Sequence, residues 1–91
     1  MTDREIQVTA EILRINFSLN PVTLYGTGAL DFRGTMIEFR TGERVLINDQ
    51  LIPCHTPKDL IRILADMGLI RPKAVRQLTF NIYKQLKKRS K

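Results

Sequence analysis

The spacing of the apolar residues changes along this chain, and the change constrains the fold more than any other feature. Apolar and polar side chains alternate in several segments between residues 22 and 47, as in strands that bury one face. Between residues 57 and 88, apolar side chains recur every three or four positions, as on one side of a helix. We therefore predict an α+β fold. An N-terminal antiparallel sheet of about four strands, within residues 5–48, is followed by two C-terminal helices, about 57–67 and 72–88, that pack on one face of the sheet.

Residues 5–19 fit two different structures. Their apolar residues alternate with period two, and the phase shifts between Ile12 and Leu13, as in a long strand with a bulge. The same segment also fits a helix, because Thr2 and Glu5 have the spacing of a capping box and one apolar stripe has a helical period. That stripe is formed by Ile6, Ala10, Leu13 and Phe17. The many β-branched residues favour the strand, and the helix remains the alternative.

A hairpin is expected around Thr41-Gly42, and its register follows from the burial of one face. Pairing Phe39 with Val45 and Ile37 with Ile47 places four apolar side chains on the same side. This register needs a connection of three or five residues, with Gly42 supplying a positive φ.

Turn and cap residues divide the rest of the chain. A strand over residues 22–32, interrupted by two glycines, ends at a tight turn at Arg33-Gly34, and Asn48-Asp49 closes the strand region. Thr56 is a favourable N-cap with proline at the first helical position, and Gly68 is a natural stop for that helix.

The charge of the chain is distributed unevenly. The net charge is +6, yet residues 1–70 carry −2 and residues 71–91 carry +8, with no acidic residue in the second segment. We expect one small domain, residues 1–91, with a basic C-terminal helix and tail over about residues 72–91. A segment of this kind indicates an anionic partner.

The second predicted helix separates apolar from basic residues. Its apolar stripe, predicted to face the core, consists of Val75, Leu78, Ile82 and Leu86. The opposite side and the tail form the predicted nucleic-acid-binding set: Lys73, Arg76, Phe80, Lys84, Lys87, Lys88 and Arg89. Cations neutralise phosphates and an aromatic ring can stack on a base, although Phe80 also suits contact with another protein.

Residues 64–78 resemble a helix-turn-helix. A leucine-alanine pair, Leu64-Ala65, precedes the turn glycine Gly68 and a second amphipathic helix, although the spacing departs from the motif by one residue around that glycine. The resemblance implies that the second helix would read DNA.

No motif in the sequence indicates catalysis, and we expect no enzyme activity, catalytic residue, cofactor or metal. The adjacent pair Cys54-His55 would point to opposite sides of an extended chain, so Cys54 is interpreted as a small buried residue. His55 is the only histidine, which leaves little for a metal cluster. Gly26-x-Gly28 lacks the third glycine of a phosphate loop, since Asp31 stands there.

The function predicted from these features is a small non-enzymatic nucleic-acid-binding protein that makes phosphate contacts, with DNA or RNA left open. The alternative is a protein-interaction module that docks its basic helix on an acidic partner in a larger complex. Two further hypotheses are that the chain forms a homo-oligomer and that it attaches to an anionic membrane surface. A single cysteine, the lack of a membrane-spanning run and the lack of a signal peptide predict an intracellular, cytoplasmic protein, or a nuclear one in a eukaryote.

Overall fold

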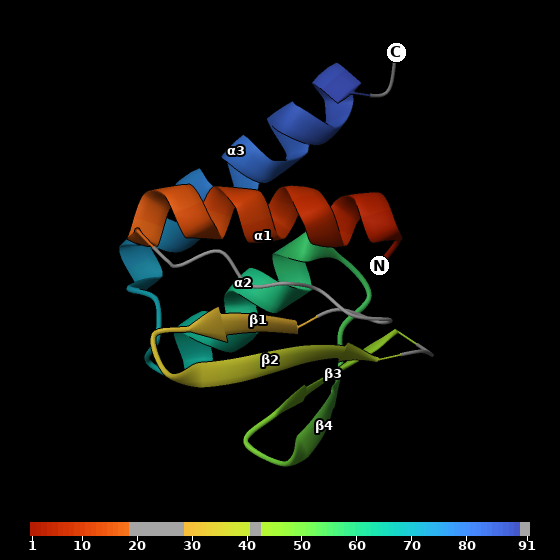
Figure 1. The fold of residues 1–91 in the computed structure, drawn as a ribbon. Helices are drawn as coiled ribbons and strands as arrows, with labels where there is room; N and C mark the ends of the chain where they lie inside the picture. Colours follow the sequence, from red (N-terminus) through yellow and green to blue (C-terminus); the bar gives the residue numbers. More distant parts are fainter. Residues whose placement is uncertain (19–28, 41–42, 90–91) are drawn as a thin grey trace.

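The fold consists of three helices on one side of a four-stranded antiparallel sheet (Figure 1). The structure is a computed structural model, and it describes residues 1–18, 29–40 and 43–89. In chain order the elements are α1 (Asp3–Phe17), β1 (Ala29–Phe32), β2 (Thr35–Arg40), β3 (Arg44–Ile47), β4 (Gln50–Pro53), α2 (Pro57–Asp66) and α3 (Pro72–Arg89). The prediction of a sheet followed by two helices is therefore wrong, because helix α1 precedes the sheet.

Residues 5–17 of the segment predicted as a bulged strand belong instead to helix α1, the alternative structure, and Leu19 lies outside the described residues. The capping box is complete: Thr2 Oγ1 accepts from the Glu5 amide at 3.1 Å, and Glu5 Oε1 accepts from the Thr2 amide at 2.8 Å. The helical stripe is used for burial, with Leu13 fully buried and Phe17 packed against the core. A β-branched residue costs a helix only a few tenths of a kcal/mol. The burial of this stripe and the hydrogen bonds of the capping box together outweigh the preference of β-branched residues for a strand.

The sheet is a meander in the order β1-β2-β3-β4. Its central register is as predicted, with Phe39 opposite Val45 and Ile37 opposite Ile47. The connection 41–43 has three residues, one of the two predicted lengths, and Glu43 in it has φ +57°. Gly42 lies outside the described residues. The side chains that face the helices form the sheet's part of the core: Leu30, Phe32, Ile37, Phe39, Val45 and Ile47.

Strand β4 was not predicted. Asn48-Asp49 was expected to close the strand region, whereas the sheet continues beyond it. The two residues have φ +51° and +63° and form a two-residue turn between paired Ile47 and Gln50. Asn and Asp tolerate this left-handed backbone better than most residues. The tight turn at Arg33-Gly34 is confirmed, with φ +53° and +93°. Residues 22–28 of the predicted second strand lie outside the described part, and its last four residues are β1.

Helices α2 and α3 lie where they were predicted. Thr56 caps α2 in a second complete capping box with Asp59, and Gly68 follows the helix with φ +78°. Helix α3 packs mainly against α1 and α2 rather than on the sheet. Its predicted stripe faces inward: Leu78 and Ile82 are buried, and the flanking apolar residues of the stripe pack against them.

Replacing Phe39 should strongly destabilise the fold. Phe39 is 3% exposed on the covered face of β2, so Phe39→Ala is expected to lower the free energy of unfolding by about 3–5 kcal/mol. Met36 is 47% exposed on the opposite face of the same strand, and Met36→Ala should cost about 0.5 kcal/mol or less. Urea titrations of both variants measure the difference. Equal losses would contradict the assignment of the two faces.

Candidate nucleic-acid interface

The outward side of α3 is an exposed basic surface. We call it the α3 face and define it by six exposed residues: Lys73, Arg76, Phe80, Lys84, Lys87 and Lys88. At 3.6 residues per turn they lie opposite the buried stripe, and the helix contains no acidic residue. The structure therefore places six of the seven predicted residues along one side of one helix. Arg89 ends the helix, and its side chain lies outside the described part of the structure.

Two contacts fix the direction of the α3 face. The buried residues Leu78 and Ile82 hold the opposite side of the helix in the core. Near the C-terminal end, Arg4 Nη2 of α1 donates to the Leu86 carbonyl oxygen at 2.6 Å. A cation close to the C-terminus of a helix is also favoured by the helix dipole. The middle of α3 and the region near its C-terminal end are thus held against the rest of the fold.

Phe80 stands in the middle of the α3 face with 59% of its surface exposed. The Lys84 ammonium lies over its ring, 6.0 Å from the ring centroid, at the outer limit of a cation–π contact. On the other side of Phe80 along the helix, a shallow hollow is lined by Lys73, Arg76, Gln77 and Phe80 itself. The surface therefore combines an accessible ring, a concavity next to it and cations on both sides.

Sequence reasoning missed Gln77, which lines this hollow. Its Nε2 donates to Asn81 Oδ1 at 3.1 Å, one helical turn away, so the position of its amide is set. The signal was available: Gln77 lies four positions after Lys73 and three before Phe80, which places it on the same side of a helix. Gln77 carries no charge, and charge defined most of the predicted set.

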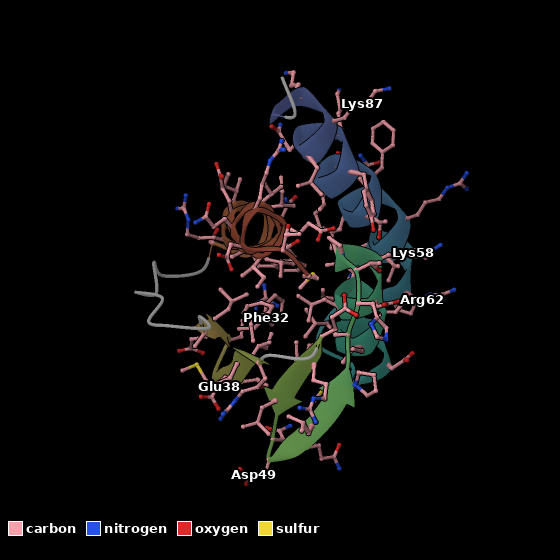
Figure 2. The ribbon with its side chains drawn as sticks, turned by 90° about the vertical axis from the view of Figure 1, so that its right-hand side faces the viewer. Phe32, Glu38, Asp49, Lys58, Arg62 and Lys87 are labelled. Atoms are coloured by element: carbon pink, nitrogen blue, oxygen red, sulfur yellow. The ribbon has the colours of Figure 1, made fainter. Side chains whose placement is uncertain are left out.

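Two further cations, Lys58 and Arg62, are exposed on α2. Figure 2 shows both on the same side of the molecule as Lys87, whereas Glu38 and Asp49 lie on the side of the sheet. The charge division along the sequence did not reveal them, because residues 1–70 are slightly acidic as a whole.

Cys54 is a small buried residue just before α2, as predicted. It is 2% exposed, and its Sγ donates to the Thr56 carbonyl at 3.7 Å. Burial, with a contribution from the Asp59 carboxylate, raises the pKa of the thiol from 9.0 to about 11. The thiol is therefore protonated at neutral pH and is a poor nucleophile.

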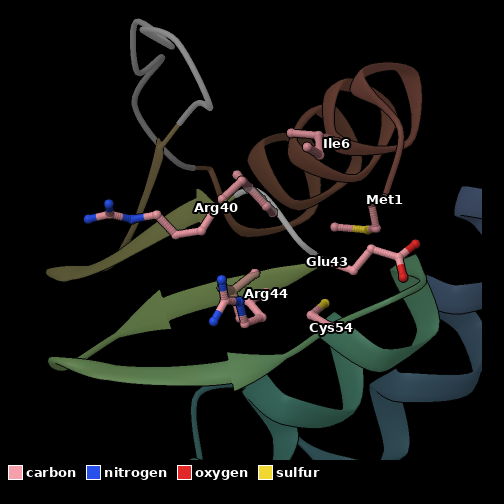
Figure 3. A pocket seen from close by; sticks show the side chains of 8 residues that line it. Met1, Ile6, Arg40, Glu43, Arg44 and Cys54 are labelled. Atoms are coloured by element: carbon pink, nitrogen blue, oxygen red, sulfur yellow. The ribbon is translucent and has the colours of Figure 1, made fainter.

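His55 does not activate this thiol. Its Nδ1 lies 2.7 Å from Glu43 Oε2, and that hydrogen bond lowers the pKa of the Glu43 carboxyl. The pocket beside Cys54 is shown in Figure 3. Met1 lines it together with residues of α1, β2, β3 and the connection between β2 and β3. Its volume of about 20 Å³ is room for one water molecule and too little for a substrate.

The described residues contain neither a group of metal ligands nor a membrane-spanning helix. In the ranges 1–18, 29–40 and 43–89, no three His, Cys, Asp or Glu side chains are grouped as metal ligands would be. None of the helices in those ranges has the length and apolar character needed to cross a bilayer. Comparison of the chain with protein-family models, curated proteins and solved structures finds no match.

The burial of Cys54 predicts a pH dependence. The folded chain should lose its thiol proton near pH 11, and the urea-unfolded chain near pH 9, as followed by the ultraviolet absorbance of the thiolate. The raised pKa means that the folded state holds the proton more tightly. The free energy of unfolding should therefore fall as the pH rises from about 9 to about 11, and Cys54→Ser should not show this thiol-linked component. A folded-state midpoint at 9 would contradict the assignment.

Proposed function

We propose that this chain is a small non-enzymatic nucleic-acid-binding protein whose α3 face contacts phosphates. The observation that carries the proposal is an 18-residue helix with no acidic residue and a row of exposed cations on its outward side. Lys73, Arg76 and Lys84 form no ion pair with any carboxylate in the described part of the chain. Their charges are thus available to an anion from outside.

Affinity in this proposal comes mainly from the release of counterions. Each phosphate neutralised by a lysine or arginine frees cations condensed on the nucleic acid, which makes binding steeply dependent on salt. The α3 face offers mostly flexible lysines rather than paired arginine forks, so we expect little reading of base sequence. Both DNA and RNA provide the phosphates. The proposed compartment is the cytoplasm, or the nucleus in a eukaryote.

The second candidate function is docking on an acidic protein in a larger complex. The exposure of Phe80 favours it, because large aromatic residues beside cations are common anchors of protein interfaces. The two functions predict different partners for the same surface. Nucleic acid that remains with the purified protein would raise its ultraviolet absorbance at the maximum of the bases relative to the absorbance of its aromatic side chains, which is weak in a chain without tryptophan.

Removing three cations from the α3 face should weaken binding and its salt dependence. In the triple variant Lys73→Gln, Arg76→Gln, Lys84→Gln, the slope of log affinity against log salt should decrease by about 2–3 units. Fluorescence anisotropy with labelled oligonucleotides of two unrelated sequences measures this, and both sequences should be affected equally.

A matched control removes the same charge elsewhere. Arg14, Arg40 and Arg44 are exposed on α1 and the sheet, and the variant Arg14→Gln, Arg40→Gln, Arg44→Gln has the same net charge as the first. We expect its salt slope to stay near that of the parent. If the α3 variant binds as the parent does, or if both variants lose the same amount, the proposed interface is wrong.

A further inference from the structure

We infer that the nucleic acid held by the α3 face is single-stranded, and that one unpaired base stacks on Phe80 in the hollow beside it. This inference rests on the proposed function and adds the class of nucleic acid to it. The argument depends on the exposed ring, on the position of the hollow and on the arrangement of the cations around both.

The exposure of Phe80 is the first step. An apolar ring that is 59% exposed in a row of cations has no role in neutralising phosphates. In a duplex the bases are stacked on one another, so that the ring could reach only their edges in a groove. A single strand presents the flat faces of its bases, and stacking on an aromatic side chain is how such faces are bound. The ring therefore suits an unpaired base.

The position of the hollow is the second step. Phe80 itself lines the hollow, so a base that stacks on the ring can occupy it. Lys84 occupies the side of Phe80 toward the C-terminus, whereas the hollow is bounded by Lys73, Arg76 and Gln77 toward the N-terminus. Side chains on a helix lean toward its N-terminus, which directs Phe80 over this concavity. A base in the hollow contacts the ring with its face and reaches the Gln77 amide with its edge.

The cations supply the third step. Lys73 and Arg76 precede Phe80, and Lys84 and Lys87 follow it, so that charges lie on both sides of the stacked base. From Lys73 to Lys87 the helix extends about 21 Å at a rise of about 1.5 Å per residue. A strand laid along the helix can therefore keep its phosphates on lysines and arginines while one base turns toward Phe80.

The test measures binding of short oligothymidylate, short oligouridylate and a DNA duplex of equal phosphate number by fluorescence anisotropy. We expect the single strands to bind at least 10-fold tighter than the duplex. Phe80→Ala should weaken single-strand binding by about 5- to 150-fold and leave the salt slope unchanged, because stacking releases no counterions. Phe80→Trp should retain binding, whereas Phe80→Leu, which keeps an apolar side chain without a π face, should lose it. Leu51→Ala, an exposed apolar residue on β4, is the control and should bind as the parent does.

The outcomes separate this inference from the proposed function. If no oligonucleotide binds, the proposed function itself fails. If the duplex binds as tightly as the single strands and Phe80→Ala changes nothing, phosphate binding stands and the single-strand inference is overturned. It is also overturned if Phe80→Leu binds as well as the parent, or if Phe80→Ala lowers the melting temperature markedly or dissociates an oligomer, because the ring would then be structural.

Discussion

The burial of one side of α3 is the constraint on which the proposed interface depends. Leu78 and Ile82 have their places against α1 and α2, and rotation of the helix by one residue would expose them and turn cations toward the core. Moving an unpaired lysine or arginine out of water costs several kcal/mol, so only one orientation of the helix is favourable. The outward direction of the cations is therefore a result of core packing. The hydrogen bond from Arg4 to the Leu86 carbonyl adds a fixed point near the far end.

A similar separation exists in the sheet. Because all three helices lie on one side, alternate residues of β1, β2 and β3 face either the core or water. Glu38 thus points away from the helices between two buried neighbours, and Asp49 lies in the turn at the sheet's end. The cations labelled on α2 and α3 face another direction (Figure 2). An anion that approaches from the helical side meets positive charge first, which favours association at low salt.

Elements with strong local signals could be predicted from the sequence, and those decided by tertiary burial could not. Proline and cap residues fixed the start of α2, and the need to bury one face gave the pairing of Phe39 with Val45. In α1 the pattern allowed two periods, and the capping box together with the core that α1 covers decides between them. β4 is four residues long and ends in Pro53, so its strand signal is weak. On α3, the cations were evident from charge, whereas Gln77 carries no charge and could be assigned to the same side only from its helical spacing to Lys73 and Phe80.

Helices α1 and α3 pack against each other although they are made at different times during synthesis. Arg4 and Leu86 are 82 positions apart, and α1 leaves the ribosome long before the helix that covers it. At about 5–20 residues per second, roughly 4–16 s pass between the two residues. During that time the apolar stripe of α1 lacks α3, and only the sheet and α2 can shelter it. Helix α3, which is made after the other described elements, is thus both the proposed binding surface and the piece that completes the core.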